Sequence, residues 1–434
     1  MKSNIFELTK GQLEEIAKDL QRKIAVGLQT DDTEIACLPT YVNPGKDFEG
    51  KVLALDWGGT NFRAAIVEFK KGAKPVTLEN LKKPLSCVET KGFSREDLFN
   101  AMASHIAQLK HLDKSVTHIG YCFSYPAAST TKVEANAETK TEAEVEGGAI
   151  LLRWTKEIWI PEMLKKPVGK PLMEYLNQYE GIKEKTQFKS IKVVNDTIAC
   201  LFAGLAQPGY DTYIGLIVGT GTNMAALIHK DQIPKLDRHY HSGDLIPVNL
   251  ESGNLVPTPD PNHAGEYLTV VDQRVDENSD QPKKQLFEKA ISGGYLGKIF
   301  ENAFPGAIES KFDGEKLTNL MNYPMIYKEE YTAVARAIYV RSAQLVAASL
   351  AGLILELIEY REDTQTYDKN IQNICLAADG SLFWSDDRNG SDYNKIVSDS
   401  LHGFLASFGL EHIHVYTSKL EDANLIGSAI AALS

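Results

Sequence analysis

Residues 52–62 read Val-Leu-Ala-Leu-Asp-Trp-Gly-Gly-Thr-Asn-Phe, and this short stretch indicates the fold more directly than any other. Four apolar residues lead into Asp56 and a Gly-Gly turn, and a second apolar run continues to Phe69, which predicts strand, tight turn, strand. A similar pattern recurs over 213–228, where Gly219-Thr220-Gly221-Thr222-Asn223 separates two apolar runs. Two unrelated Gly- and Asn-rich hairpins are the alternative. The repeated pattern favours a duplicated α/β domain with a cleft between the copies.

Helical patterns surround these hairpins. Apolar residues recur at helical spacing over 13–24, and Thr9 with Gln12 predicts a capping box in front of them. A proline-free pattern over 335–360 contains many small residues, which suits close packing inside a domain. Another small-residue helix is expected over 422–433. Residues 127–148 have almost no large apolar side chains, so we expect an exposed insertion there.

Length and charge narrow the class of protein. A chain of 434 residues predicts two domains. A hydrophobic content of 43% and a charged content of 24% are typical of a soluble globular protein. The formal net charge of −12 disfavours nucleic acid and anionic lipid as partners. A bound nucleotide would therefore depend on backbone amides, a few local cations and Mg²⁺.

Cysteine use and the absence of a leader indicate a cytoplasmic location. The five cysteines are widely spaced and form no Cys-x-x-Cys pair, which favours free thiols in a reducing compartment. No apolar run near Met1 is long enough for a signal peptide. The most apolar segment, 343–355, lies between Arg341 and Glu356 and is shorter than the roughly 20 residues that span a bilayer.

The two glycine turns are candidate phosphate sites. Glycines let the backbone approach an oxyanion, and successive N–H groups can then point at phosphate. Asp56 at its strand end could hold Mg²⁺, directly or through water, and Thr60 and Thr220 offer hydroxyls. The stretch Gly293-Gly294-Tyr295-Leu296-Gly297-Lys298 lacks the spacing and the following Ser or Thr of a Walker loop, so a P-loop enzyme is disfavoured.

Asp196 is the candidate for acid–base chemistry. It follows the apolar run that ends at Val194-Asn195 and precedes a helical pattern, so it could act as a base or cap the helix, and the second hypothesis is favoured for a lone Asp. Ser124-Tyr125-Pro126 and Trp154-Thr155-Lys156 carry little signal by themselves. Glu251 and Glu288 would be surface carboxylates by default.

Taken together, these segments resemble the hexokinase family. The phosphate signature of that family resembles Leu55-Asp56-Trp57-Gly58-Gly59-Thr60-Asn61-Phe62-Arg63, and its sugar signature resembles Phe123-Ser124-Tyr125-Pro126 followed by Leu151-Leu152-Arg153-Trp154-Thr155-Lys156. Further matches are Val194-Asn195-Asp196-Thr197, Ile217-Val218-Gly219-Thr220-Gly221-Thr222-Asn223, Phe287-Glu288-Lys289-Ala290-Ile291-Ser292-Gly293 and Asp379-Gly380-Ser381-Leu382. Each segment alone is weak, but their order along nearly the whole chain is highly specific.

The resemblance implies an ATP-dependent kinase that transfers the γ-phosphoryl group to the 6-hydroxyl of a hexose, most simply glucose, in the first step of glycolysis. Asp196 would be the general base, and Lys156 would stabilise charge on the transferring group. The residues implied to bind the sugar are Ser124, Tyr125, Pro126, Thr155, Lys156, Asn195, Asp196, Asn223, Glu251 and Glu288. Those implied to bind ATP are Asp56, Gly58, Gly59, Thr60, Asn61, Arg63, Gly219, Thr220, Gly221, Gly380 and Ser381, and Asp56 is the candidate Mg²⁺ ligand.

The fold that the resemblance implies is the two-lobed, actin-like (ribonuclease H-like) α/β fold. Each lobe would be a mixed five-stranded sheet flanked by helices, with the active site in the cleft between them. The expected small lobe comprises 48–194 plus 421–434, and the large lobe comprises 1–47 plus 195–420. The expected partners are the small-molecule substrates, and the protein would be a monomer or a homodimer.

Three departures from the family pattern and three competing interpretations accompany this resemblance. Tyr125 replaces the usual Phe, Ser252 follows Glu251 where Trp is expected, and the 127–148 segment is long. A non-catalytic sugar-binding regulator on the same fold would lack Asp196 or the phosphate turns, and both are present. Other actin-like ATPases would share the hairpins but not the sugar motifs. Zinc-carrying bacterial sugar kinases would have clustered cysteines.

Overall fold

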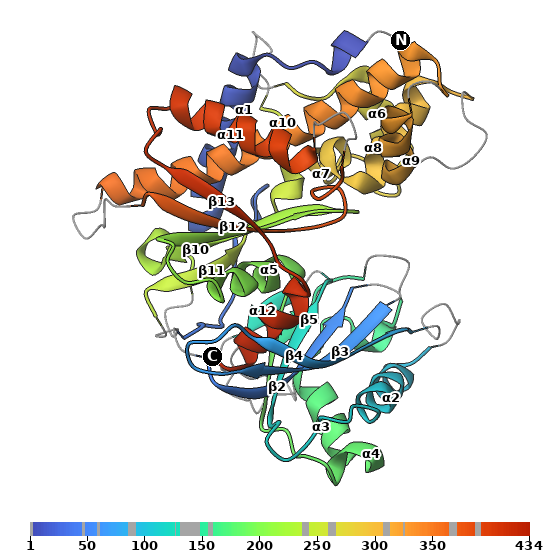
Figure 1. Ribbon diagram of the computed structural model, residues 1–434, viewed down its shortest axis with the longest axis vertical. Helices are drawn as coiled ribbons and strands as arrows, with labels where there is room; N and C mark the ends of the chain where they lie inside the picture. The colour runs from blue at the N-terminus through green and yellow to red at the C-terminus, as the bar shows by residue number, and fades with distance from the viewer. Residues whose placement is uncertain are drawn as a thin grey trace.

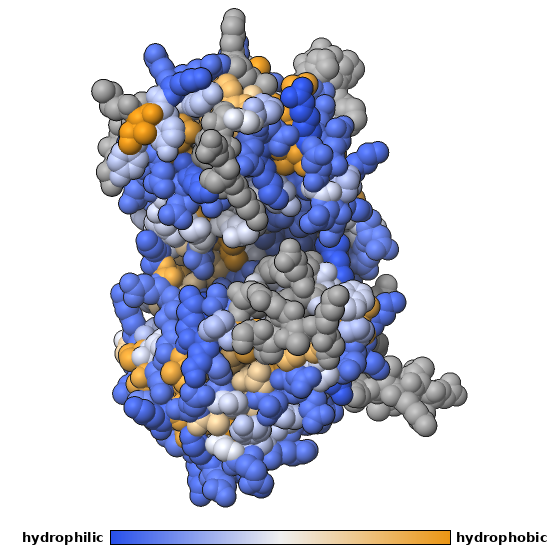
Figure 2. Space-filling model, turned by 90° about the vertical axis from the view of Figure 1, so that its right-hand side faces the viewer, coloured by the Kyte–Doolittle hydropathy of each residue, from blue (hydrophilic) through white to orange (hydrophobic). Residues whose placement is uncertain are grey.

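The computed structural model describes residues 3–45, 48–58, 61–85, 93–125, 127–130, 148–154, 159–236, 243–258, 266–306, 313–323, 326–363, 371–386 and 392–434. The molecule is elongated and has two halves, each built on one sheet (Figure 1). Figure 2 shows a mostly hydrophilic outer surface that is hollowed between the two halves.

The first sheet has the strand order β4-β3-β2-β5-β8. The antiparallel part comprises β2 (Gly50–Trp57), β3 (Asn61–Phe69) and β4 (Val76–Pro84), and β5 (His118–Phe123) and β8 (Ser190–Val194) continue it in parallel with β2. The central strand β2 is buried from Val52 to Trp57, as its unbroken apolar run predicts. The face of this sheet that points away from the second half is covered by α2 (Arg95–Ile106), α3 (Lys170–Gln178) and α4 (Glu180–Lys183) (Figure 1).

The second sheet repeats this topology in the order β11-β10-β9-β12-β13 and adds the two-residue strand β1 (Leu38–Pro39) beside β11, so it has six strands where five are expected. Here β9 (Thr212–Val218) and β10 (Thr222–His229) form the hairpin that corresponds to β2 and β3, and β11 (Leu245–Asn249) corresponds to β4. The strands β12 (Asn373–Asp379) and β13 (His414–Lys419) run parallel to β9. The duplication predicted from the two hairpins is therefore confirmed.

Long helices cover the far face of the second sheet (Figure 1). These are α1 (Lys10–Gln29), α10 (Glu329–Asp363) and α11 (Tyr393–Ser407). The capping box of Thr9 and Gln12 is present, and the predicted apolar face of α1 is buried. Gly352 allows α1 and α10 to pack closely, because a Cβ there would lie 2.4 Å from the carbonyl oxygen of Ala17.

Four shorter helices complete this half beside α10, namely α6 (Val270–Glu277), α7 (Leu286–Ile291), α8 (Gly293–Ala303) and α9 (Gly314–Asn322). A buried ion pair joins α10 to α6, because Arg341 donates to both carboxylate oxygens of Asp272 at 2.7 and 2.8 Å. In turn, Lys289 on α7 donates to Asp276 on α6 at 2.6 Å. The position of α7 is thus fixed by buried polar contacts as well as by apolar packing.

Two small-residue helices, α5 (Asp196–Leu205) and α12 (Ala423–Ala432), lie between the sheets (Figure 1). They share a core cluster with residues of β2 and β3 on one side and β10 on the other. Their contact is close, since a Cβ on Gly427 would lie 1.8 Å from the carbonyl oxygen of Ala199. These two helices therefore connect the halves.

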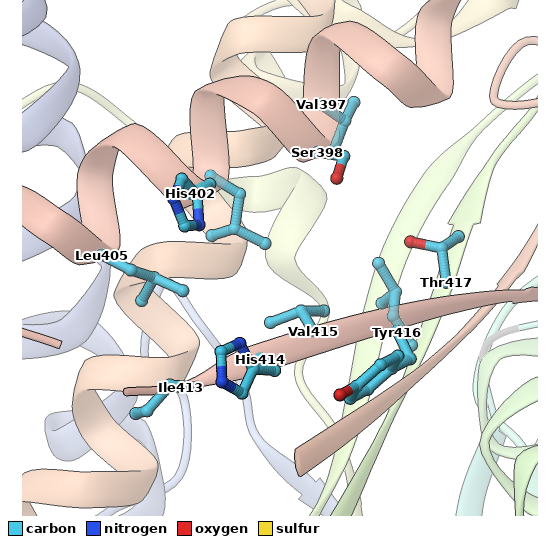
Figure 3. A pocket seen from close by; sticks show the side chains of 11 residues that line it. Val397, Ser398, His402, Leu405, Ile413, His414, Val415, Tyr416 and Thr417 are labelled. Atoms are coloured by element: carbon cyan, nitrogen blue, oxygen red, sulfur yellow. The ribbon is translucent and has the colours of Figure 1, made fainter. Parts of the chain in front are cut away.

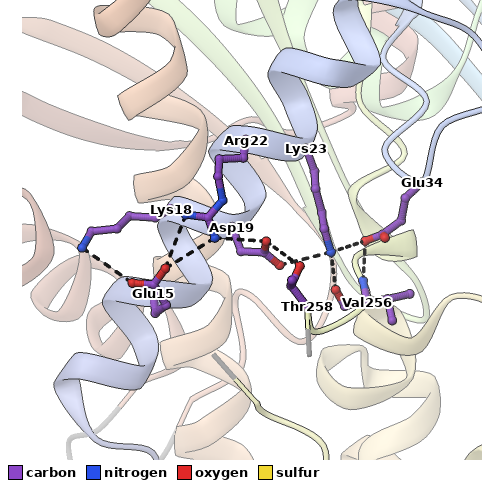
Figure 4. A network of polar contacts seen from close by, with 8 residues as sticks. All are labelled: Glu15, Lys18, Asp19, Arg22, Lys23, Glu34, Val256 and Thr258. Carbon is purple, nitrogen blue, oxygen red and sulfur yellow. Dashed lines mark hydrogen bonds and ion pairs between the residues drawn. The ribbon is translucent and has the colours of Figure 1, made fainter. Parts of the chain in front are cut away.

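A polar network fixes α1 to the segment that follows β11 (Figure 4). Thr258 donates to Asp19 at 2.7 Å, and Lys23 pairs with Asp19 and Glu34 at 3.1 and 2.9 Å. Lys23 also donates to the carbonyl oxygen of Val256, whose own N–H donates to Glu34 at 2.6 Å. The N-terminal helix is thereby held in the same half as the second sheet.

Two further expectations concern single segments. In α10, Glu329–Ile358 is apolar and long enough to cross a membrane by composition, but 83% of its apolar window is buried inside the protein. The insertion begins and ends in the antiparallel pair β6 (Ala127–Thr130) and β7 (Gly148–Leu151). Residues 131–147 between these strands lie outside the described residues.

Candidate active site

The carboxyl ends of three parallel strands bring Asp56 and Asp196 to the same edge of the first sheet. Cys122 on β5 pairs in register with Asp56 on β2 and with Val194 on β8, and Asp196 follows two residues after Val194. Burial raises the pKa of the Cys122 thiol, and the negative charges of Asp56 and Asp196 raise it further. Both carboxylates therefore lie near this thiol, at the side of the sheet that faces the other half.

Asn195, and not Asp196, is the N-cap of α5, because its side-chain oxygen accepts from the N–H of Ile198 at 2.8 Å. The hypothesis that Asp196 caps this helix is therefore wrong. Asp196 is the first helical residue, and its Oδ1 accepts from the N–H of Thr197 at 2.9 Å. Among the described residues its Oδ2 has no partner, so the carboxylate has an oxygen available to accept a proton.

Asp56 is buried and paired with Arg63. Its Oδ2 accepts from Nε and a terminal nitrogen of Arg63 at 2.8 and 2.6 Å, and the other terminal nitrogen donates to Asp422 at 2.8 Å. Burial opposes the charge on Arg63, but Asp56 and Asp422 together raise its pKa above the ordinary value. The guanidinium thus joins the first hairpin to the start of α12.

The second glycine turn lies against two other segments of its half. The N–H of Gly219 donates to the carbonyl oxygen of Gly221 at 2.9 Å, and Gly293 and Gly294 donate to the carbonyl oxygens of Gly219 and Thr220 at 2.7 and 3.2 Å. Gly293 and Gly294 begin α8, in the stretch whose spacing does not match a Walker loop. Their position beside the turn shows a packing role that spacing alone did not reveal.

Gly380 adjoins the same turn from β12. Its φ of +113° favours glycine, and a Cβ there would lie 2.2 Å from the carbonyl oxygen of Val218. A Cβ on Gly219 would lie 3.3 Å from Gly380. The residues predicted to bind ATP after β9 and after β12, including Ser381, therefore form one surface. In the first half, Gly58 and Asn61 are the described residues on either side of the candidate phosphate site at Gly59 and Thr60, which lie outside the described residues.

Aromatic packing holds the loop that contains Ser124. The Tyr125 ring is 5.0 to 5.2 Å from those of Phe123, Trp57 and Trp154, and Tyr125 is only 3% exposed. Burial raises the pKa of its hydroxyl. The indole of Trp154 also donates to the carbonyl oxygen of Ile160 at 2.9 Å. These ring contacts hold Tyr125, in the first predicted sugar segment, beside Trp154, in the second.

Glu288 on α7 reaches the second hairpin. Its Oε2 accepts from the N–H of Thr222 at 3.0 Å, and a Cβ on Gly221 would lie 2.8 Å from the same oxygen. Gly253 packs against it from the other side, since a Cβ there would lie 3.1 Å from the Cβ of Glu288. This carboxylate is thus adjacent to the candidate phosphate turn at Gly219–Gly221 as well as to the segment that contains Glu251.

Glu251 has a left-handed backbone with φ 59°, an uncommon conformation for a non-glycine residue that tends to occur at functional sites. Burial raises the pKa of its carboxyl, an effect that a hydrogen bond from Asn249 opposes, while Asp196 raises it and Arg153 lowers it. The bond from Asn249 to Oε1 is 2.7 Å long, and Asn249 in turn accepts from Asn223 at 2.6 Å. Sequence reasoning missed Asn249, which carries no signal beyond its place at a strand end.

Five of the predicted site residues lie outside the described residues, namely Gly59, Thr60, Pro126, Thr155 and Lys156. The described residues contain no group of three or more His, Cys, Asp and Glu side chains that could hold a metal ion. A cation held by one carboxylate and by substrate phosphates, as is usual for Mg²⁺, needs no such group.

Two cavities differ in whether predicted site residues line them. One of about 200 Å³ lies between α11 and β13, lined by His402, His414 and Tyr416 among others, and includes none of the predicted site residues (Figure 3). A smaller one of about 30 Å³ lies between the halves and is lined by Asn195, Asn249 and the end of β8. Only the second belongs to the candidate site.

Comparison with known proteins finds one family along the chain. A family model described as Hexokinase matches residues 3–205, and a second of the same description matches 213–333 and 315–434. The chain is 25% identical to Hexokinase-9 of Oryza sativa subsp. japonica, over 97% of this chain and 86% of that protein, and 29% identical to Hexokinase-2 of Schizosaccharomyces pombe, over 69% and 63%. The solved structure of the Schistosoma mansoni hexokinase complexed with glucose superposes with a TM-score of 0.75 at 24% identity, covering 99% of this chain and 96% of that one.

Proposed function

Because the chain belongs to the hexokinase family, it is an ATP-dependent hexose kinase, and we propose that it phosphorylates the 6-hydroxyl of glucose with Asp196 as the general base. The observation that carries this proposal is the position of Asp196. It begins α5 at the strand edge that faces the other half, close to Asp56 and beside an N-cap supplied by Asn195. Its carboxylate is therefore not needed to cap the helix.

The role that we propose for Asp196 is to remove one proton from the attacking hydroxyl. In phosphoryl transfer the protein mainly positions the reactants and stabilises charge. A primary alcohol is a weak nucleophile, and a carboxylate within hydrogen-bond reach can take its proton as the bond to phosphorus forms. Oδ1 of Asp196 is held by the N–H of Thr197, which leaves Oδ2 to face the hydroxyl. Lys156 is proposed to balance charge on the γ-phosphoryl group.

The proposed hexose site takes contacts from both halves. Ser124 follows β5 of the first half, Asn195 is the N-cap of α5 between the two sheets, and Asn223, Glu251 and Glu288 come from the second half. A hexose presents hydroxyls that both donate and accept, which suits this mixture of amides and carboxylates. Pro126, Thr155 and Lys156 are proposed to complete the site, and Tyr125 supports it through its packing against Trp57 and Trp154.

The proposed ATP site consists of the two glycine turns with Gly380 and Ser381. The close approach of Gly219 to Gly380 supports this, since bare backbone is what phosphates need. Arg63 and Asn61 border the first turn. Asp56 is the proposed Mg²⁺ ligand through Oδ1 or through water, and bound Mg²⁺ would neutralise charge on the phosphates.

Movement of the two halves follows from this division of contacts. We propose that the lobes are 48–194 plus 421–434 and 1–47 plus 195–420, and that hexose binding closes the cleft and excludes water.

The four described cysteines, Cys37, Cys122, Cys200 and Cys375, are buried free thiols, which supports a cytoplasmic location.

A coupled assay of the purified protein with Mg·ATP and a panel of hexoses tests the proposal. We expect formation of hexose 6-phosphate, with the highest kcat/KM for glucose. Binding of glucose without turnover would instead indicate a non-catalytic regulator, and preference for another hexose would refute the proposed specificity.

A further inference from the structure

Asn249 lies at the point where the two proposed sugar ligands of the second half meet. It is the last residue of β11, is only 6% exposed, and lines the small cavity between the halves together with Asn195. Its Oδ1 accepts from Nδ2 of Asn223 at 2.6 Å, and its Nδ2 donates to Oε1 of Glu251 at 2.7 Å. Both of these side-chain bonds thus go to residues of the proposed site.

We propose that Asn249 is a positioning residue of the hexose site, which fixes the amide of Asn223 and the carboxylate of Glu251 in one mutual orientation. The proposal rests on the function proposed above, because it assumes that Asn223 and Glu251 contact the sugar.

The hydrogen bonds determine how the side-chain amides of Asn223 and Asn249 are oriented. Oδ1 of Asn223 accepts from the N–H groups of Met224 and Ser252 at 2.8 and 3.2 Å, so its Nδ2 must be the atom that faces Asn249. A flipped Asn249 would oppose two NH₂ groups on one side and two oxygens on the other. The remaining N–H of Asn223 and Oε2 of Glu251 are therefore presented as one donor and one acceptor, which suits two neighbouring sugar hydroxyls.

The same contact favours the ionised form of Glu251. Burial raises the pKa of this carboxyl, and the charge of Asp196 at the start of α5 acts in the same direction. The Asn249 hydrogen bond and the charge of Arg153, which follows β7, lower it. Glu288 on α7 packs against Gly253 close by and adds another carboxylate. Removal of the Asn249 donor should thus raise the pKa of Glu251, and a larger fraction of it would be protonated at a given pH.

The test uses Asn249→Asp, which keeps the size and the acceptor but replaces the donor, and Asn249→Ala, which removes both. We expect the hexose KM to rise about tenfold or more, because a hydrogen bond to a charged group is lost, while the ATP KM stays within about twofold. The acid limb of kcat/KM for hexose should move to higher pH in Asn249→Ala. A hexose KM and an acid limb that match those of the unmodified enzyme, in variants that melt normally, would overturn the proposal.

Asn177 provides the matched control. It is a half-buried asparagine on α3 that also makes two hydrogen bonds, with the carbonyl oxygen and the N–H of Phe188 at 2.9 and 2.8 Å. Asn177→Ala should lower the melting temperature and leave both the hexose KM and the pH profile unchanged. If it moves them as far as Asn249→Ala does, the effect of Asn249 is general destabilisation and the proposal fails.

Two more variants separate failure of this inference from failure of the proposed site. Asn249→Ala combined with Glu251→Gln should weaken hexose binding by less than the two single effects together, because both act on one carboxylate. Normal hexose affinity in Asn223→Ala and in Glu251→Gln would remove both residues from the site and overturn site and inference together. Weak binding in those two variants beside normal binding in Asn249→Ala would overturn the inference alone.

Discussion

Gly221→Ala tests how closely the proposed phosphate turn and the proposed sugar site depend on each other. Gly221 has no positive φ, so alanine fits its backbone and the effect is steric. The new Cβ would lie 2.8 Å from Oε2 of Glu288, whereas the favourable separation is about 3.5 Å or more. The carboxylate must therefore move by roughly 0.5 to 1 Å, away from its 3.0 Å bond to the N–H of Thr222.

A misplacement of about 1 Å in an active site can cost about 10²-fold in rate. We therefore expect kcat/KM for hexose to fall about ten- to a hundredfold, the equivalent of about 1.4 to 2.8 kcal/mol. A coupled assay in which each substrate is varied in turn measures this fall. The thermal melt should change little, because the atom that gives way is the end of a side chain.

Gly403→Ala is the control for this variant. Gly403 lies in α11, and a Cβ there would meet no heavy atom within 4 Å. This substitution should stabilise the helix by about 0.5 to 1 kcal/mol and leave both KM values unchanged. If Gly221→Ala also leaves hexose kinetics unchanged, Glu288 is not a sugar ligand held beside this turn, and the reasoning is refuted.

Three further predictions concern stability, motion and the insertion. Asp272→Ala should lower the free energy of unfolding by about 3 to 5 kcal/mol in urea denaturation, because it leaves the guanidinium of Arg341, only 1% exposed, without its carboxylate. Burial alone would raise the pKa of Asp272, yet Arg341 and hydrogen bonds lower it below its ordinary value. The ion pair therefore stabilises the fold above the unfolded pKa of about 3.9, and this stabilisation is lost as the pH falls through the lower folded value. A decrease in the free energy of unfolding of less than about 1 kcal/mol at neutral pH would contradict this prediction. Saturating glucose should reduce the radius of gyration in small-angle scattering, and an unchanged radius would indicate a rigid cleft. Replacement of Lys132–Glu146 by a short Gly-Ser link should leave the melting temperature unchanged, because the segment has little apolar surface to bury, and unfolding would show that it belongs to the core.

Local patterns predicted much of the fold. The capping box at Thr9 and the apolar stripe of α1 depend on residues three or four positions apart, and both are present. The two hairpins follow from alternating apolar runs around glycine turns, and their repetition predicted the duplicated topology. The two-residue strand β1 escaped prediction because Leu38 and Pro39 are a strand only through their pairing with β11.

The polar contacts of the site could not be predicted in this way. Arg63 and Asp422 are 359 positions apart, and nothing near either residue in the sequence indicates their pairing. Asn249 has a partner 26 positions away across the β10–β11 pair, and a single asparagine at a strand end carries no pattern. The N-cap of α5 was assigned one residue too late, because Asn195 and Asp196 are both good capping residues and only the backbone distinguishes them.

The most direct test of the proposed mechanism is the turnover of Asp196→Asn. Asparagine is nearly isosteric, Asn195 still caps α5, and the side-chain oxygen can still accept from the N–H of Thr197, so the fold should be retained. With Asp196 as the general base, calorimetry should show hexose binding close to that of the unmodified enzyme, while kcat in the coupled assay falls by at least about 10²-fold. Near-normal turnover in a variant that melts normally and binds hexose would contradict the assignment of Asp196 as the base.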